Sequence, residues 1–527
     1  MSGAELSLAI IGAVDVALRH GQRLMKLCEA FKHAEGELTE RILRVEAGWL
    51  RTVKQLEFMQ MVGGSMDEYH KQINEKVIEM LQSKLKIVIS KLERVLRMPN
   101  RDSDTTSSES NETVTPRRWK YALLKESIDE AIQELEAWQR ETDPSWYLLL
   151  KIANPQIDQA LSRDDNDTIT LFPTTSTIRA GLRDANSNEL TGIFLPPNEL
   201  QKMSIAGIPF CDARVATRLS SRKGPQRLLL TQVECPPEAK THAVKRDLRD
   251  LARKLSHDSP RTFGLLSCKG VIEQVDPMAA GTQARVTFTI VFRTPADLSD
   301  PRGLRDHLIS GLEGMTLSDK FDIARQMATS VSYVHTFGFV HKNVRPETVI
   351  VFTDPRATSP PAAFLVGFGS SRKDEGKTYR VGDDNWEKNL YRHPSRQGVR
   401  PDEEYTMQHD IYSLGVGLLE VGLSKSFVSY DKEGIHPISL QGIGAPGNNT
   451  SPWQPDALKN RLVSLAANDL PRRMGRRYAA VVKTCLTCLD PDNTDFGDEQ
   501  EFLDKDGVLV GVRYIEKVLS QLNAICV

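Results

Sequence analysis

Residues 338–352, which read GFVHKNVRPETVIVF, hold the side chains with the clearest potential for chemistry. Asn343 has no titratable carboxyl group, so it cannot act as a general base near neutral pH. Thr348 offers only a neutral hydroxyl, which is a poor ligand for a hard cation. His341 has no base or nucleophile beside it in this stretch, which favours a structural, hydrogen-bonding role over a catalytic one. The stretch is therefore spaced like the loop of an enzyme but lacks the groups for acid–base or metal chemistry.

The same residues resemble the catalytic loop of protein kinases, which has the form H-R-D-L-x-x-x-N. In that family the Asp accepts the proton of the substrate hydroxyl and the Asn holds a magnesium ion. His341 opens the frame here, but Asn343 occupies the base position and Thr348 the metal position. Arg345 replaces the loop Lys, which keeps a cation but changes its geometry. The resemblance implies a kinase loop that no longer transfers phosphate.

The order of elements over residues 200–527 also resembles a kinase, with strands first and helices after. We expect an N-lobe at 200–293 and a C-lobe at 294–527. The hydrophobic pattern predicts strands at 212–219, 227–234, 262–272 and 285–292, helices at 241–256 and 317–337, and a hinge at 293–301.

Two later stretches carry the resemblance further. Residues 363–370 (AFLVGFGS) stand where kinases have the strand that leads into D-F-G, with Gly367 in place of the Asp. Residues 410–420 (DIYSLGVGLLE) resemble the long buried helix of the family. That resemblance implies that Asp410 hydrogen-bonds the loop backbone and helps to seat His341.

The departures from the kinase pattern all remove groups that phosphoryl transfer uses. No G-x-G-x-x-G precedes the third strand, whose Lys is replaced by Gln232 or Glu234, and Ser395 stands for the activation-segment Glu. Electrostatic groups of this kind are typically worth about 3–4 kcal/mol each when removed singly. We therefore expect no metal site, no cofactor beyond weakly bound ATP, and no carboxylate in the cleft beside Asn343 and Gly367. A distant Asp or Glu brought there, with a Lys opposite, would overturn this expectation.

The N-terminal third has a helical pattern. Residues 4–97 contain no Pro, and their apolar residues recur at three- and four-residue steps, which predicts long amphipathic helices. We predict a helical bundle over residues 1–162, followed by a connector over 163–199. Within the bundle we expect a break at 63–65, a polar loop at 100–116, a helix at 119–138 and a further segment at 146–161. The stripes expected to be buried are Ile42, Val45, Trp49, Val53, Leu56 and Met59, and Leu85, Val88, Ile89, Leu92 and Leu96.

Residues 84–97 (KLKIVISKLERVLR) carry five basic residues and one acidic residue. A basic amphipathic helix can lie on an anionic membrane. The same pattern also fits an ordinary bundle helix with a solvated face. The two interpretations are compatible if the bundle can open.

Several smaller signals have competing interpretations. Cys485 and Cys488 form C-x-x-C within an apolar helical pattern and without a second pair, which favours core thiols over a metal site. Residues that would be either phosphorylated or solvated loop positions are Ser370, Ser371, Thr378 and Tyr379. The basic pairs Arg472–Arg473 and Arg476–Arg477 predict a solvated surface.

Composition excludes some classes of function. A net charge of −2 over 527 residues argues against a nucleic-acid or polyanionic partner. Seven scattered Cys residues fit a reducing compartment. The apolar start at residues 6–18 is interrupted by Asp15 and is too short for a signal peptide or a spanning helix. These observations predict a cytoplasmic protein of multidomain α and α+β class, with recruitment to a membrane left open.

The opening SGAELSLAIIGAVDVALRHG, followed by long helices, a polar loop and a kinase-like region, resembles fungal proteins with a HeLo-type (HET-s/LopB-like) helical domain. The order of parts is also similar to the mixed lineage kinase domain-like family, in which a pseudokinase restrains or releases a bundle that damages membranes. The resemblance implies a catalytically inactive kinase-like domain that regulates a helical cell-death effector. Residues 84–97 or the first helix would act on the membrane, an upstream sensor or other protein partner would bind, and self-association would accompany activation. The alternatives are a scaffold that binds another kinase or a receptor without membrane activity, and an atypical active Ser/Thr kinase.

Overall fold

The computed structural model divides the chain into two compact units, Met1–Pro173 and Thr174–Val527, called here the helical unit and the mixed unit. Together they contain both helix and sheet, as the predicted α and α+β class requires. The structure describes residues 3–30, 37–62, 68–97, 129, 132–133, 135, 192–218, 226–234, 241–256, 260–276, 285–295, 298–353, 360–373, 383–431, 434–437, 454–493, 495–496 and 514–525. Predictions that lie outside them concern residues 63–65, 100–116, most of 119–138, 146–161 and most of the 163–199 connector, and Thr378 and Tyr379.

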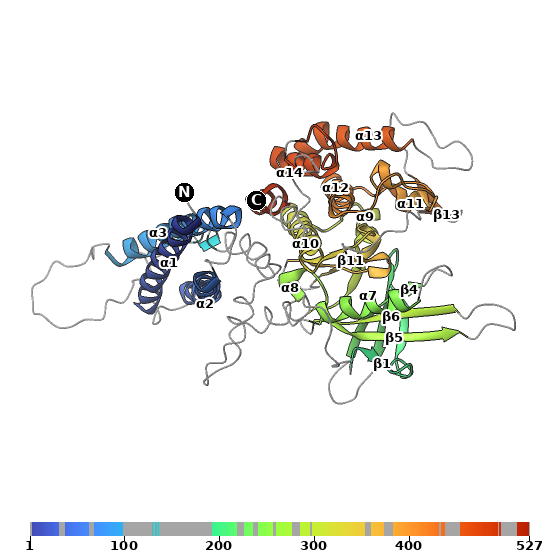
Figure 1. The fold of residues 1–527 in the computed structure, drawn as a ribbon, viewed down its shortest axis with the longest axis horizontal. Helices are drawn as coiled ribbons and strands as arrows, with labels where there is room; N and C mark the ends of the chain where they lie inside the picture. Colours follow the sequence, from blue (N-terminus) through green and yellow to red (C-terminus); the bar gives the residue numbers. More distant parts are fainter. Residues whose placement is uncertain are drawn as a thin grey trace, which may run out of the picture. The chain divides into compact units, whose positions relative to one another are not determined.

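Three long helices dominate the described part of the helical unit. They are α1 (Gly3–Ala30), α2 (Glu37–Val62) and α3 (Glu68–Arg97). Helix α1 packs against both α2 and α3 (Figure 1). The predicted stripes are buried along their described length: Ile42, Val45, Trp49, Leu56 and Met59 on α2, and Leu85, Val88, Ile89 and Leu92 on α3, with Val53 half-buried. Ile132 and Leu135, from the region predicted to form a later helix, are helical and buried too.

Gly21 allows α1 to approach α2 closely. A Cβ atom at this position would lie 1.7 Å from a ring carbon of Trp49, whereas a Cβ at Gly12 of the same helix would meet nothing within 4 Å. We expect Gly21→Ala to destabilise the helical unit by about 1–3 kcal/mol because the indole must move. Gly12→Ala should instead stabilise it by about 0.5–1 kcal/mol through helix propensity. Amide hydrogen exchange of α1 and α2 in the full chain measures both changes, and a shift of the same sign for both would contradict the close approach.

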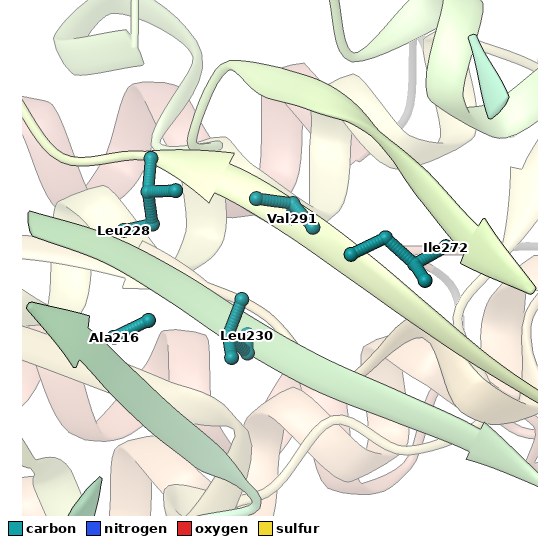
Figure 2. Packing of buried hydrophobic residues seen from close by; sticks show 5 residues of the cluster. All are labelled: Ala216, Leu228, Leu230, Ile272 and Val291. Carbon is teal, nitrogen blue, oxygen red and sulfur yellow. The ribbon is translucent and has the colours of Figure 1, made fainter. Parts of the chain in front are cut away.

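The mixed unit is built on a six-stranded sheet with the strand order β1-β5-β6-β4-β3-β2. Strands β1 and β5 pair in parallel, and every other neighbouring pair in this sheet is antiparallel. Figure 2 shows the apolar cluster that four of its strands build, formed by Ala216, Leu228, Leu230, Ile272 and Val291. The strands are β1 (Phe194–Leu195), β2 (Ser204–Gly207), β3 (Ala213–Arg218), β4 (Gln226–Glu234), β5 (Cys268–Asp276) and β6 (Arg285–Arg293).

Helices and small sheets follow the large sheet along the chain (Figure 1). The helices are α7 (Thr241–Lys254), α8 (Pro260–Phe263), α9 (Leu304–Ile309), α10 (Leu317–Thr336), α11 (Trp386–Asn389), α12 (Met407–Leu423), α13 (Pro455–Asn468), α14 (Leu470–Leu486) and α16 (Ser520–Asn523), with the single turns η3 (Pro346–Thr348), η4 (Phe368–Ser370), η5 (Pro394–Arg396) and η7 (Ile515–Leu519). The further strands are β7 (Pro301–Gly303), β8 (Phe339–Val340), β9 (Val349–Phe352), β10 (Ala362–Leu365), β11 (Arg372–Lys373), β12 (Val428–Asp431) and β13 (Gly434–Pro437).

The strand predicted at 262–272 begins later than expected. Residues Pro260–Phe263 form the helical turn α8, and β5 starts only at Cys268. Pro at the first helical position is pre-organised for a helix, and Gly264 follows its end with φ +61°, a conformation that glycine adopts without strain. Pro260 and Gly264 therefore favour a helical turn at the start of the predicted strand, and the strand itself forms only after them.

Two short strands extend the sheet beyond the predicted ones. Strand β1 lies within the segment predicted as a connector, and it covers one edge of β5. Strand β2 at the other edge is exposed at all four positions, so it shows no alternation of apolar and polar residues. No described helix contains an apolar stretch long enough to cross a bilayer.

Candidate functional site

The loop singled out from the sequence connects α10 to β9 within the mixed unit. It passes through β8 and the single turn η3, and α12 lies behind it. The carboxylate of Asp410, which is fully buried, accepts hydrogen bonds from the backbone N–H groups of His341 (2.7 Å) and Lys342 (2.8 Å). The hydrogen bonding to the loop backbone expected of Asp410 is therefore present.

The Asp410 carboxylate also stabilises an unusual backbone conformation at Lys342. Lys342 has φ +63°, in the left-handed region that non-glycine residues rarely adopt. Two further side chains bind the same carboxylate, His335 at 3.1 Å and the hydroxyl of Tyr405 at 2.7 Å. Four partners fixed on one buried carboxylate hold the loop in a conformation that local preference alone would not maintain.

His341 is held as a neutral, structural residue. Its Nε2 lies 3.1 Å from the carbonyl oxygen of Val366, and its Nδ1 accepts from the N–H of Asn343 at 3.3 Å. Burial lowers the pKa of His341 to about 4. With both ring nitrogens engaged, the imidazole has no lone pair or proton free for a substrate.

The side chains of Asn343, Arg345 and Thr348 are held by contacts within the loop. Arg345 Nε donates to Asn343 Oδ1 at 2.8 Å. The Thr348 hydroxyl lies 2.7 Å from the carbonyl oxygen of Asn343 and accepts from the backbone N–H of Arg345 at 3.2 Å. Thr348 is fully buried. These contacts therefore stabilise the loop.

Gly367, which the resemblance aligns with the D-F-G Asp, has φ +81° and lies at the start of the turn η4. A Cβ added there would lie 2.5 Å from Cγ2 of Thr348. The backbone conformation and the neighbouring methyl group together leave no room for a carboxylate side chain at this position.

One carboxylate does lie beside Asn343, contrary to the expectation that none would. Asp212 comes from the turn before β3, and its Oδ2 lies 2.7 Å from Arg345 Nη2 and 3.5 Å from Asn343 Nδ2. Its cation is Arg345 rather than a Lys, and the ion pair is made through Oδ2. In the sequence Asp212 was simply the first residue of a predicted strand, and no local signal connects it to a loop more than a hundred residues later.

A buried ionic network continues from this loop into the core. Arg305, fully buried, bonds Glu347 at 2.9 Å and Glu420 at 2.6 Å, and it also contacts the hydroxyl of Tyr391. Burial alone would raise the pKa of Glu347, but Arg305 and Arg345 hold it below its ordinary value, while burial raises the pKa of Glu420. Sequence analysis missed Arg305, because one Arg in a short polar helix has no distinguishing pattern.

Among the described residues one cluster has the composition of a metal site. The ligand atoms of His393, Glu403 and His409 lie within 4.8 Å of one another. However, His409 Nδ1 accepts from the backbone N–H of Thr406 at 3.0 Å, so its Nε2 carries the proton and cannot ligate an ion. Lys459 Nζ lies 3.2 Å from His393 Nε2 and would repel a cation. The cluster therefore ties the segment around η5 to α12 by hydrogen bonds.

The remaining candidates lie away from this loop or on its edge. Gln232 is exposed on β4, and Ser395 bonds the two imidazoles of the cluster above. Ser370 is exposed and Ser371 is half-buried. Cys485 and Cys488 are buried, and Arg472, Arg473, Arg476 and Arg477 are exposed.

Buried histidines predict a loss of stability in mild acid. Burial lowers the pKa of His307 and of His341 to about 4 and that of His393 to about 3. Below the unfolded-state pKa of about 6.5, the unfolded chain binds protons that the folded chain does not, so stability falls as the pH drops toward 4. For His341 alone the loss at pH 5 is about 2 kcal/mol. Urea unfolding between pH 7.5 and 5 measures the slope, which His307→Asn should reduce and a change of the exposed His436 should not.

No protein-family model matches the chain, and no curated protein matches it.

Proposed function

We propose that residues 200–527 form a bilobal, protein-kinase-like fold that transfers no phosphate and regulates a helical effector in residues 1–162. The observation that carries this proposal is the set of contacts at the loop. The hydroxyl of Thr348, the amide oxygen of Asn343 and the ring nitrogens of His341 all bond within the loop or its immediate neighbours. These contacts favour a role in fixing the loop conformation over a role in catalysis.

Energetic magnitudes support the loss of catalysis. A missing electrostatic group at a phosphoryl-transfer site typically costs about 100- to 1000-fold in rate. The base and both metal ligands of a kinase are replaced here, and losses at coupled positions do not add. Asp212 pairs with Arg345 at 2.7 Å and so helps to hold the loop, and the Asp212→Ala variant below tests whether it also acts as a base.

The effector role rests on α3. Its apolar stripe, Leu85, Val88, Ile89 and Leu92, is buried in the helical unit, whereas Lys86 is exposed and Lys84 and Lys91 are half-buried on the same helix. A basic helix with a buried apolar face can act on an anionic bilayer only after that face has been uncovered. Regulation then consists of controlling when the bundle opens.

A vesicle-leakage assay on the full chain tests the proposal. Fused to a chemically inducible dimeriser, the chain is expected to release dye from phosphatidylserine vesicles after dimerisation and to leave neutral vesicles intact. Lys84→Glu/Lys86→Glu/Lys91→Glu should abolish release, because electrostatic attraction is worth about 1 kcal/mol for each Lys or Arg near the surface. The matched control Lys202→Glu/Arg472→Glu/Arg476→Glu should retain it.

Absence of leakage under every dimerising condition would refute the membrane role and favour a scaffold. The same preparation incubated with Mg-ATP is expected to incorporate no phosphate. Incorporation that persists in Asn343→Ala and Asp212→Ala would come from a contaminating kinase. Incorporation lost in either variant would show that the chain is an active enzyme.

A further inference from the structure

The turn at residues 208–212, between β2 and β3, reaches from the large sheet to the catalytic-type loop. The backbone N–H of Asp212 donates to the carbonyl oxygen of Glu347 at 3.0 Å, and its side chain pairs with Arg345 at 2.7 Å. Strands β2 and β3 belong to the six-stranded sheet. Residues 345–347 belong to the part of the mixed unit that follows this sheet along the chain, called here the helical half. These two bonds therefore join the sheet to the helical half.

The tip of this turn makes two further contacts with the helical half. The ring of Phe210 lies 4.6 Å from that of Tyr430, centroid to centroid. At Gly303, which precedes α9, an added Cβ would lie 3.1 Å from both Cys211 Cβ and the carbonyl oxygen of Pro209. Four successive residues of the turn are thus seated against three separate segments of the helical half.

The seated conformation is strained at one residue. Phe210 has φ +52°, in the left-handed region, which costs a bulky residue of order 1–3 kcal/mol. Glycine or asparagine would adopt this conformation more easily. A strained residue held by contacts at its own tip returns to a relaxed conformation when those contacts are lost.

We propose that the 208–212 turn is a releasable latch that closes the sheet onto the catalytic-type loop and thereby holds the mixed unit in its restraining conformation. The latch deepens the proposed function and rests on it for its biological meaning, although its opening can be measured independently. In the closed state Asp212 occupies Arg345, and Cys211 is half-buried beside Gly303, where burial raises the pKa of its thiol to about 12. Opening uncovers both, so Cys211 reports the state of the latch.

The rate at which a maleimide labels Cys211 in the full chain measures opening. A thiol that reacts only from the open state is labelled in proportion to the open population. Cys211→Ser identifies the signal against the other thiols, of which Cys28, Cys268, Cys485 and Cys488 are buried. Labelling of the parent chain should be slow.

Two variants should open the latch by different means. Asp212→Asn keeps the size of the side chain but removes the charge-assisted bond, and we expect labelling about 10-fold faster or more. In Gly303→Ala the added methyl group would press against Cys211 and Pro209. This variant should therefore also speed labelling, without changing any charge near the thiol. The control Gly207→Ala, on β2, should leave the rate unchanged, because its Cβ would meet nothing within 4 Å.

The outcomes separate the two proposals. Fast labelling of the parent chain, or unchanged labelling in both Asp212→Asn and Gly303→Ala with native circular dichroism, would overturn the latch. If Asp212→Asn alone accelerates labelling, the effect is one of charge on the thiol and the latch is also refuted. If both variants accelerate it while vesicle leakage stays unaffected, the latch stands and its coupling to a membrane-acting bundle fails.

Discussion

Arg305→Met is expected to destabilise the mixed unit by about 3–5 kcal/mol, the usual result of removing one partner from a buried ion pair. Arg305 is fully buried and bonds two carboxylates, those of Glu347 and Glu420. Without the guanidinium, Glu420 loses its cation in the interior and, among the described residues, Glu347 keeps only Arg345, at 3.6 Å. Met has a similar length and no charge, so the change isolates the electrostatic contribution from that of packing.

Arg302→Met provides the matched control. Arg302 lies three residues earlier and pairs with Asp306 at 2.6 Å, but its side chain is 40% exposed. An exposed pair contributes about 1 kcal/mol at most. Urea unfolding of the full chain, followed in the phase that reports the mixed unit, measures both variants. Equal losses for the two arginines would show that the network around Arg305 has no special role.

Asp410→Ala should destabilise the mixed unit by at least about 3 kcal/mol, because it leaves several buried donors without an acceptor. These donors include the backbone N–H groups of His341 and Lys342 and the hydroxyl of Tyr405. The variant should also release Lys342 from its left-handed conformation. Amide exchange of residues 338–348 is therefore expected to increase more than exchange in β6.

Two controls accompany this variant. Asp410→Asn retains one acceptor oxygen and the volume of the side chain, so its effect should be intermediate. Asp322→Ala removes a partly exposed carboxylate that pairs with Arg325 at 2.9 Å, and it should cost about 1 kcal/mol at most. Uniform exchange across the unit in Asp410→Ala would contradict a specific role in fixing the loop.

Elements whose formation depends on local pattern were predictable. The stripes on α2 and α3 follow from the period of their apolar residues. Helix α12, around residues 410–420, was expected from a resemblance, since it is buried on every side and has no single apolar face. The hydrogen bonds of Asp410 were expected from a resemblance rather than from periodicity. Strand β2 escaped prediction because all of its residues are exposed, and a strand held mainly by backbone pairing has no apolar signal.

The chemistry of the cleft was less predictable, because it depends on contacts between segments far apart in the chain. Asp212 and Arg345 are brought together by the path of the β2–β3 turn, which no window of sequence reveals. Arg305 likewise gathers Glu347 and Glu420, which lie 42 and 115 residues away. The residue types and their order in the sequence were enough to single out the loop at 338–352. Which charged side chains meet at that loop is determined by the fold.

Gly367 has a consequence for how sequences of this kind can change. Any residue with a side chain there encounters the methyl group of Thr348 at 2.5 Å and a backbone angle that disfavours it. Placing an acidic group at 367 would thus require a smaller residue at 348 and a reshaped peptide as well. A single substitution at 367 therefore cannot add a carboxylate there without a second change at the neighbouring position.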